Sequence, residues 1–582
     1  MNRKFIVGPP GTGKTRDLVN LYYEKIQLYP IERTQIISHT NIAADEICER
    51  IYNKENAKRY EQKNNVIIWD KLEENKKLFL SENKEDRRVV STISYYCKEN
   101  LRHPPMFDKE SYIELCRIHP FFMRFYSNKK SFDLRSLCSK HPFFKAIGFA
   151  ADNGQTLSEW WRSLHLSDKQ KYKYSIHALE ELNYYYQGFK SDYKINKKSD
   201  NLLDFIDIIE KFNTKASTPE LDLLIVDEAQ DCSVPQLKAL EKMEINVKES
   251  YWAGDPDQAI FEFAGAKPSL FAELARNPFK ELKEGYRCPR VINEYCKEVI
   301  GPVWDKYEGW RTWEPREELD IHGKRTGVVV EGEKYRLENL EHCPKLPLLI
   351  ERLYSGETAI FCYRAEGDTS VNPYNSHGFK IRGSLEKVTS FLKKYGLRYA
   401  EWEGDPNTEK SAYVPNWELE CHRNFTLWME DKPIHLSLIE KMFKKSTSTL
   451  IARKKDDFNP RDLKSHKLIQ KEYTFDEFVK LGLVNEEAKQ YKDFFAVKIK
   501  DDVARKQYIQ KTMYHNLDLQ KKIKIFYGNI HKIKGSEFEN SILDETITRD
   551  ENEFTRRRLR YVACSRARKT LWLLKTSTGK QL

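Results

Sequence analysis

The sequence lacks the features that mark several special classes of protein. No apolar run approaches the ~18 residues that a membrane-spanning helix needs, and the first eight residues contain no stretch resembling a signal peptide. The 11 cysteines are odd in number, scattered and nowhere arranged as CxxC, which argues against a disulfide framework or an iron–sulfur site. We therefore expect reduced thiols, a cytoplasmic location and no membrane association.

The composition indicates a folded chain with several domains. Its 582 residues are enough for about three to five domains of ordinary size. Charged residues make up 32% of the chain, which could indicate disorder, but 32 Tyr, 30 Phe and 11 Trp favour packed cores. The net charge of +11 (99 Lys and Arg minus 88 Asp and Glu) permits a nucleic-acid partner without proving one.

Several short apolar runs end at polar residues typical of ligand sites. Such runs, bounded by turn residues, predict buried parallel strands, and ligands of open α/β sheets bind at the carboxyl ends of these strands. The runs lie at Phe5–Val7, Gln35–Ile37, Leu221–Val226, Ser250–Ala253, Thr358–Tyr363 and Ile523–Tyr527. We therefore expect an α/β protein whose function lies in the residues after each run.

Two long stretches interrupt this pattern. Residues 92–220 are aromatic, charged and mostly helical in period, and residues 366–524 are Lys-rich and also largely helical. Within the second stretch, Thr474 to Glu477 has capping-box spacing, Gly482 is a helix stop and Asn485 is a second cap. This predicts a helix–turn–helix pair, either facing duplex nucleic acid or forming a plain helical hairpin, which we favour.

A phosphate-binding motif follows the first run. The string GPPGTGKT fits GxxxxGK[ST] and stands between a predicted strand and a helical segment. Its backbone N–H groups and the helix N-terminus favour phosphate, Lys14 should reach the β- and γ-phosphates, and Thr15 should hold Mg²⁺. The candidate binding residues are Gly8, Pro9, Pro10, Gly11, Thr12, Gly13, Lys14 and Thr15.

An acidic pair after the third run supplies the second half of this site. Asp227 can orient Mg²⁺ and Glu228 can activate the attacking water. With the phosphate loop upstream, the pair predicts hydrolysis of ATP or GTP, without indicating its purpose.

The string DEAQD at 227–231 resembles motif II of the superfamily 1 helicases. Other segments resemble further motifs of this family in the family's order, namely 40–50 (Ia), 254–266 (III), 282–289 (IV), 530–538 (V) and 557–567 (VI). The DEAQD and GDPDQ strings are similar to those of the UvrD/Rep/PcrA branch. The resemblance implies an ATP- and Mg²⁺-dependent DNA helicase that moves 3′-to-5′ on single-stranded DNA.

The same resemblance implies a fold of two RecA-like parallel-sheet motor domains, each with a mostly helical insertion. Domain 1A would comprise residues 1–91 and 221–290, with insertion 1B at 92–220. Domain 2A would comprise residues 291–365 and 525–582, with insertion 2B at 366–524. The 15 residues after Ala567 leave no expected room for a nuclease domain.

The resemblance also implies roles around the nucleotide. Gln258 would sense the γ-phosphate, and Arg287 and Arg566 would contact it. Tyr286 would stack on adenine beside Arg16, with Gly535 and Glu537 near the ribose. The family's adenine-binding Q motif is not found before Gly8, which leaves the preference for ATP over other nucleotides open.

The DNA contacts that the resemblance implies would use stacking and backbone grip. Phe261 and Phe263 stand where the family stacks aromatics on bases, although core phenylalanines are an alternative. The candidate DNA-binding residues are His39, Asn41, Thr92, Phe261, Phe263 and His531. Expected partners are single-stranded DNA, single-strand/duplex junctions and a repair, replication or defence protein, with the chain itself a monomer.

Three alternatives to an autonomous helicase stay open. One is a single-stranded DNA motor of a repair, recombination or defence complex that unwinds little alone. The others are a non-hydrolysing nucleic-acid scaffold, which the intact motifs disfavour, and an RNA substrate, because stacking and backbone grip do not exclude the 2′-OH.

A repeated CxxH pattern gives a weak metal candidate. Cys116 and His119 recur 22 residues later as Cys138 and His141, each pair followed by Pro-Phe-Phe. Four such ligands could hold Zn²⁺. We favour the alternative, in which the Pro-Phe-Phe segments place aromatic rings in the core of the insertion.

Overall fold

The computed structural model describes most of the chain, and all structural statements below refer to the described part. The described residues are 3–74, 88–125, 141–164, 169, 174–195, 198–199, 201–217, 219–262, 265–307, 312–316, 327–332, 345–355, 357–362, 384–402, 412, 414–452, 468, 470–491, 493–498, 503–514, 523–544 and 553–574.

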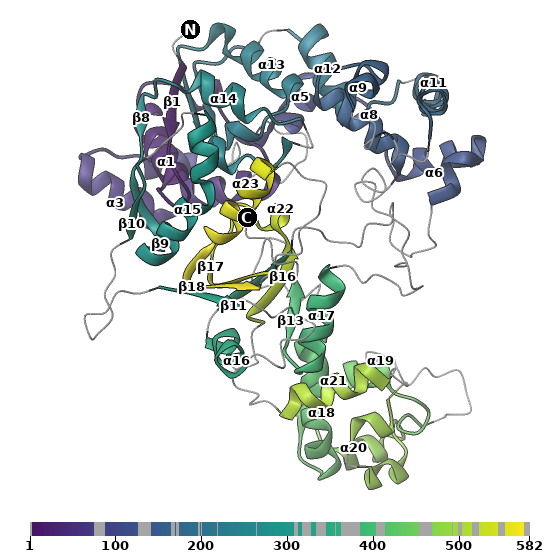
Figure 1. The fold of residues 1–582 in the computed structure, drawn as a ribbon. Coiled ribbons are helices and arrows are strands. Elements are labelled where there is room, and N and C mark those ends of the chain that lie inside the picture. Colours follow the sequence, from purple (N-terminus) through teal and green to yellow (C-terminus); the bar gives the residue numbers. More distant parts are fainter. Residues whose placement is uncertain are drawn as a thin grey trace. The chain divides into compact units, whose positions relative to one another are not determined.

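The N-terminal half is built on a parallel sheet of six strands, ordered β3-β2-β6-β7-β1-β8 (Figure 1). Every neighbouring pair in this sheet runs parallel. The strands are β1 (Arg3–Val7), β2 (Thr34–Ser38), β3 (Val90–Thr92), β6 (Leu223–Val226), β7 (Glu249–Gly254) and β8 (Lys280–Glu281). The four strands predicted from apolar runs in this half are confirmed.

Helices cover both faces of this sheet, which explains why its strands are almost continuously apolar. Successive side chains of a strand point to opposite faces, so Ile6 joins one core cluster while Phe5 and Val7 join the other. The first cluster includes α1 (Lys14–Lys25) and α2 (Asn41–Ile51). The second includes α5 (Ile93–Asn100), α12 (Phe205–Lys215), α13 (Val234–Met243) and α14 (Pro268–Leu274).

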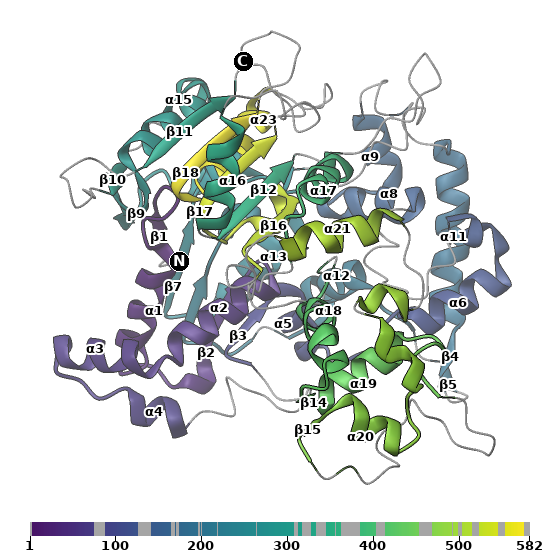
Figure 2. The same ribbon diagram turned by 90° about the horizontal axis from the view of Figure 1, so that it is seen from below.

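A separate helical group lies within residues 92–220, as predicted. It contains α6 (Lys109–Ile118), α8 (Pro142–Asp152), α9 (Leu157–Ser163) and α11 (Ile176–Asp192). These helices share an aromatic-rich core, and Figure 2 shows them gathered beside α12. Both Pro-Phe-Phe segments contribute to that core through Phe122, Phe143 and Phe144, so the predicted placement of these rings is confirmed.

A second six-stranded sheet has the order β11-β18-β17-β12-β16-β13. Its strands are β11 (Val328–Gly332), β12 (Thr358–Cys362), β13 (Tyr399–Glu401), β16 (Ile525–Asn529), β17 (Phe538–Asp544) and β18 (Ala567–Leu574). β12 runs parallel to both of its neighbours, and β13 runs parallel to β16. The strands predicted at 358–363 and 523–527 are therefore confirmed.

The second sheet and its core include elements from within residues 366–524, the stretch predicted as an insertion. Besides β13, helices α17 (Ser384–Lys394) and α21 (Val503–Tyr514) pack into the core of this sheet with α16 (Leu346–Ser355). The second sheet and its helices therefore extend past residue 366, the predicted start of the insertion. The sequence did not indicate β13, because a strand of three residues gives too short an apolar run to be recognised.

Helices α18 (Asn416–Met429), α19 (Leu436–Lys445) and α20 (Phe475–Lys480) form a further core around Trp428. The predicted capping box of Thr474 and Glu477 forms at the start of α20. The prediction of a second α-helix in this pair is wrong, because a five-residue 3₁₀ helix, Glu486–Gln490, stands in its place. The Asn485 side chain donates to Ser448 O at 2.7 Å instead of capping that helix.

The chain divides into two compact units, which do not follow the predicted boundary at residue 290. The described residues of the first unit lie within 1–328 and 548–569, and the rest belong to the second. In the first unit, β9 (Glu284–Pro289), α15 (Arg290–Tyr307), β10 (Glu314–Arg316) and α23 (Glu553–Cys564) accompany the N-terminal sheet. Among the described residues, every helix is too short or too polar to cross a membrane.

Candidate functional site

The phosphate loop connects β1 to α1 at the carboxyl edge of the first sheet. Gly13 immediately precedes α1 with a φ of 85°, and Gly11 has a φ of 71°, a region that favours glycine. A Cβ atom on Gly11 would lie 2.5 Å from the Cβ of Arg287, so only glycine fits this turn. The loop therefore presents its backbone and the N-terminus of α1 to a ligand.

Lys14 is the buried cation of this loop, with 7% of its surface exposed. Its Nζ donates to Gly8 O at 2.7 Å and to Pro9 O at 3.1 Å. Burial lowers the pKa of Lys14, while the nearby carboxylates of Asp255, Glu228 and Asp227 oppose that shift. The ammonium group is thus held inside the loop, where the oxygens of a bound phosphate would replace the two carbonyls as its partners.

Asp227 and Thr15 meet between β6 and the phosphate loop, because the hydroxyl of Thr15 donates to Asp227 Oδ2 at 3.0 Å. Burial is the main cause that raises the pKa of Asp227 to about 7, and the negative charge of Glu228 is the second. A divalent cation would stabilise the ionised carboxylate, and hydroxyl and carboxylate oxygens are the ligands that Mg²⁺ prefers. These two residues therefore fit Mg²⁺.

Glu228 has a left-handed backbone, with φ of 54° and ψ of 38°, which is uncommon for a non-glycine residue. Two contacts accompany this conformation. The backbone N–H of Glu228 donates to Asp227 Oδ1 at 3.0 Å, and its carboxylate accepts from the Gln230 side-chain amide. The strained turn thus fixes two adjacent carboxylates with separate partners, a combination typical of functional sites.

A chain of hydrogen bonds, buried beyond its first link, leads from Glu228 to Arg566. The Gln230 Oε1 atom accepts from Asp255 N at 3.0 Å, and Asp255 Oδ2 accepts from Gln258 Nε2 at 2.8 Å. Gln258 Oε1 then accepts from Arg566 Nη2 at 2.9 Å. The fold thereby joins residues 308 positions apart in sequence.

Sequence reasoning assigned no role to Gln230 and Asp255, two of the three residues that connect Glu228 to Arg566. Both stand in the DEAQD and GDPDQ strings that follow the apolar runs of β6 and β7, and both are buried polar residues. That position was the available signal, because a buried polar group needs a partner.

Tyr286 and Arg16 lie together beside the loop. The backbone N–H of Tyr286 donates to Gly11 O at 2.8 Å, and the Arg16 guanidinium lies 4.3 Å from the centre of the Tyr286 ring. Tyr286 is 47% exposed, which leaves ring surface available for stacking. Its neighbour Arg287 donates to Ser565 O at 3.4 Å, next to Arg566.

The candidate DNA-binding residues fall in three places. His39 directly follows β2, and Thr92 ends the neighbouring strand β3 and caps the N-terminus of α5. The His39 ring lies 5.3 Å from that of Phe261. Asn41 is exposed at the start of α2. Phe263 lies outside the described residues. His531, in α22 (Ile530–Ile533), belongs to the second unit with Gly535 and Glu537.

The zinc candidates are engaged in packing where they are described. His119 packs on Tyr185 with ring centres 4.9 Å apart, and His141 Nδ1 accepts from Phe143 N at the start of α8. Cys116 is buried in the aromatic core, and Cys138 lies outside the described residues. No group of three or more metal-binding side chains occurs in the described part of the chain.

This geometry defines a P-loop nucleotide-binding site at the carboxyl edge of a parallel sheet. Residues 2–278 match the UvrD/REP helicase N-terminal domain, and residues 524–574 match the UvrD-like helicase C-terminal domain. The chain belongs to the UvrD/Rep family of superfamily 1 helicases.

The chain is also similar to a curated protein, the ATP-dependent DNA helicase Rep of Buchnera aphidicola subsp. Baizongia pistaciae (strain Bp). The two sequences are 26% identical over 280 residues. The match covers 46% of this chain and 36% of that helicase, so it spans about a third of the relative.

The raised pKa of Asp227 predicts a pH-dependent response to Mg²⁺. The ionised carboxylate binds the cation, and the fraction ionised falls as the pH drops through about 7. We expect Mg²⁺ to raise the melting temperature more at pH 8 than at pH 6, as measured by differential scanning fluorimetry. Asp227→Asn should remove this difference.

Asp222 provides the matched control, because it is a buried aspartate just before the opposite end of β6, paired with Arg33 and Lys248. Asp222→Asn should keep the pH-dependent Mg²⁺ response even if it lowers stability. An equal Mg²⁺ response at both pH values in the parent protein would contradict the assigned cation site.

Proposed function

We propose that this protein is an ATP-driven DNA helicase that moves 3′-to-5′ along single-stranded DNA and unwinds duplex. The observation that carries the proposal is the hydrogen-bond chain from Glu228, beside the phosphate loop, to Arg566. Membership of the UvrD/Rep family and the similarity to an ATP-dependent DNA helicase, Rep, support it. We propose that the protein acts on DNA in the cytoplasm.

In the proposed ATPase step, the loop amides and Lys14 bind the phosphates and Glu228 accepts a proton from the attacking water. Thr15 and Asp227 would hold Mg²⁺, which when bound would supply positive charge that offsets the charge of the phosphates. Gln258 and Arg566 already share a hydrogen bond, so a phosphate that engages one changes the partner of the other. Arg287 supplies a second guanidinium near the same backbone segment.

Tyr286 and Arg16 are proposed to hold the base of the nucleotide. The exposed Tyr286 ring and the guanidinium over it offer stacking surfaces that do not distinguish bases strongly. Glu537 and Gly535 are proposed contacts to the ribose.

The proposed DNA grip uses the aromatic pair His39 and Phe261, with Asn41, Thr92, Phe263 and His531 as further contacts. The pair lies on the same sheet edge as the nucleotide site, so a shift at that edge can move both. We further propose that the chain comprises motor domains 1A and 2A with insertions 1B and 2B, and acts as a monomer.

The second candidate function is a single-stranded DNA motor within a repair, recombination or defence complex. Its ATP site would be identical, and it would differ by displacing little duplex without a partner. The motifs favour neither alternative.

The ATPase assignment predicts different outcomes for two variants. Lys14→Ala should lower DNA-stimulated ATP hydrolysis by about 10²–10³-fold, because it removes a preorganised charge at the phosphates, while single-stranded DNA binding persists. Glu228→Gln should bind ATP but not turn it over. Phosphate release and nucleotide filter binding measure the two effects.

The control for this experiment is Lys248→Ala, since Lys248 is 61% exposed at the amino-terminal side of the same sheet. It should hydrolyse ATP at the parental rate. Substantial DNA-stimulated turnover by Lys14→Ala, or normal turnover by Glu228→Gln, would show that the active site is misassigned.

The stacking assignment predicts weaker DNA binding when either ring is removed. Phe261→Ala and His39→Ala should each weaken binding of a dT oligonucleotide by an amount equivalent to ~1–3 kcal/mol per lost stack, measured by fluorescence anisotropy. Phe279→Ala is the control, because Phe279 is 58% exposed and packs on Tyr251 instead. If all three variants bind the oligonucleotide as tightly as the parent protein, the rings of His39 and Phe261 are packing residues only.

Polarity and unwinding are tested together on duplexes with a 3′ or a 5′ single-stranded tail. The proposal predicts ATP-dependent strand displacement from the 3′-tailed duplex and little from the 5′-tailed one. Displacement only from the 5′ tail would refute the polarity. ATP hydrolysis stimulated by single-stranded DNA without displacement would favour the motor-subunit alternative.

A further inference from the structure

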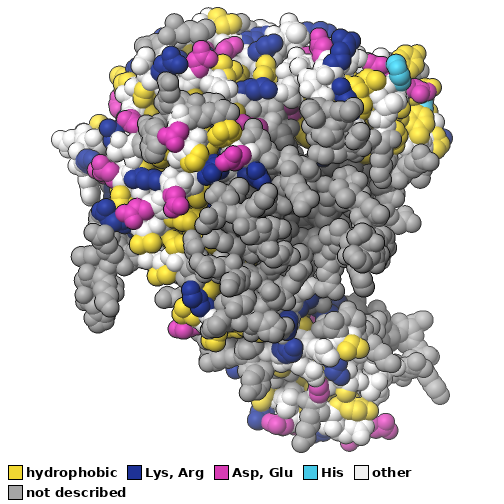
Figure 3. All heavy atoms as spheres, in the orientation of Figure 1, with side chains coloured by type: hydrophobic (Ala, Val, Ile, Leu, Met, Phe, Trp, Pro, Cys, Tyr) yellow, Lys and Arg dark blue, Asp and Glu magenta, His cyan; other side chains and the backbone are white. Residues whose placement is uncertain are grey.

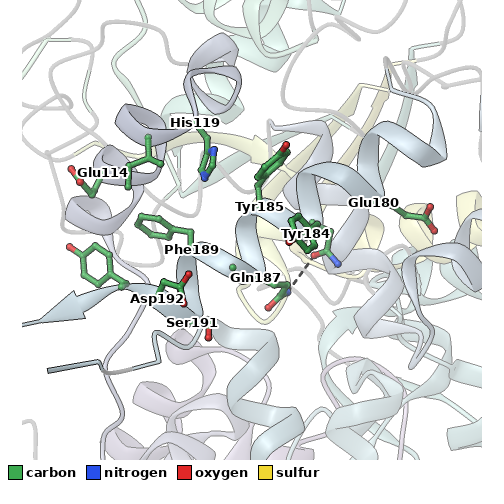
Figure 4. Close-up of a pocket in the computed structure, with 13 residues that line it drawn as sticks. Glu114, His119, Glu180, Tyr184, Tyr185, Gln187, Phe189, Ser191 and Asp192 are labelled. Carbon is green, nitrogen blue, oxygen red and sulfur yellow. Dashed lines mark hydrogen bonds between the residues drawn. The ribbon is translucent and has the colours of Figure 1, made fainter.

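A groove lies between α6 and α11 in the first unit, remote in sequence from the nucleotide motifs. Its volume is about 1040 Å³, and Figure 4 shows the side chains that line it. One wall is the outer stripe of α11, with i, i+3, i+4 spacing from Glu180 to Ser191, while Leu179, Leu182 and Tyr186 of the same helix face the core. The other wall includes Glu114, Ile118 and His119 at the end of α6.

The groove exposes aromatic and aliphatic surface on regular helices. Tyr184 is 76% exposed and Ile118 is 49% exposed, although α11 is otherwise anchored in the aromatic core. Tyr185 packs on His119 and on Phe121, with ring centres 4.9 and 5.4 Å apart, which holds the groove floor in place. Figure 3 shows hydrophobic and histidine side chains gathered at the edge where Figure 1 places α11.

The charge of the groove is opposite to that of the chain. Among the residues that the structure describes, 13 line the groove, and they include Glu114, Glu180 and Asp192 but no lysine or arginine, in a chain with 99 of these. Glu114 pairs with Arg117 at 2.6 Å, and Glu180 accepts a hydrogen bond from Ser158, whereas Asp192 is exposed at the far end of α11. Glu180 and Asp192 therefore give the described lining a net negative charge, which disfavours DNA phosphates and favours cations.

Tyr193, at the end of the groove, lies near further carboxylates, which affect the pKa of its hydroxyl group. Burial raises the pKa of Tyr193, and the nearby carboxylates of Asp108, Glu114 and Glu110 raise it further. Aromatic faces combined with carboxylates are the surroundings that suit a guanidinium or an ammonium group.

We propose that the groove between α6 and α11 binds an extended, arginine- or lysine-bearing segment of a partner protein. The run from Glu180 to Asp192 covers ~18 Å of helix axis, the length of about five or six extended residues. The cationic side chains pair with Glu180 and Asp192 and lie against Tyr184. The inference is independent of the proposed helicase activity.

Two glycines provide a matched pair of variants for the test. A Cβ at Gly188, on the groove wall, meets no atom within 4 Å, and the same is true of Gly148 in α8, which does not line the groove. Both lie inside helices, so a larger side chain is accommodated without backbone strain. Gly188→Leu fills the groove, Gly148→Leu is its control, and Gly188→Ala should retain binding.

The experiment uses the full chain and a fluorescein-labelled decapeptide of alternating Arg and Ser with one central Trp, followed by anisotropy at low salt. The expected result is binding that weakens about tenfold in Gly188→Leu and in the Glu180→Gln, Asp192→Asn double variant, but not in Gly148→Leu. A peptide with Glu in place of Arg should not bind.

Three results would overturn the proposal. They are equal peptide binding by Gly188→Leu and the parent, equal binding of the Glu peptide, and a loss of labelled dT oligonucleotide binding in Gly188→Leu that matches the loss of peptide binding. The last would make the groove a nucleic-acid contact. Unaltered ATP hydrolysis in all groove variants, expected here, separates this result from any failure of the proposed helicase activity.

Discussion

The buried amide of Gln230 is the contact on which the arrangement of the site depends. Its nitrogen holds the Glu228 carboxylate and its oxygen accepts from the backbone of Asp255, so one side chain ties the end of β6 to the end of β7. A Cβ on Gly254 would lie 2.5 Å from that oxygen, which shows how little room surrounds it. In such an interior an unpaired polar group is costly, and each partner therefore fixes the next.

Much of the fold could be predicted because parallel strands buried on both faces have a strong signature. The runs at Phe5–Val7 and Thr358–Tyr363 were recognisable as strands, since apolar side chains must fill both layers. β13 could not be found in this way, because a strand of three residues at a sheet edge has no periodicity to detect. The packing of α15 and α23 with the N-terminal sheet depends on long-range contacts that local patterns do not encode.

The site shows the same division between local motif and long-range geometry. The phosphate loop and Asp227 could be predicted because each motif carries its own chemistry within a few residues. The left-handed backbone of Glu228 could not be predicted, because the motif does not encode it, and the contact between Gln258 and Arg566 could not, because it joins residues 308 positions apart. The acidic groove on α11 was also hidden, since its residues become neighbours only on a helix beside α6. Family resemblance supplied the roles that spacing alone left open.

Arg566 also has a second attachment. Its Nε donates to Val562 O at 2.9 Å, so the guanidinium satisfies a carbonyl at the C-terminal turn of α23. The Ser565 hydroxyl donates to the same carbonyl at 2.9 Å, so two neighbouring side chains hold this turn, and a shift of the guanidinium leaves the hydroxyl as the remaining donor of the two. Arg566 thus joins the last turn of α23 to Gln258, so that any displacement of its guanidinium acts on both the helix end and the segment after β7.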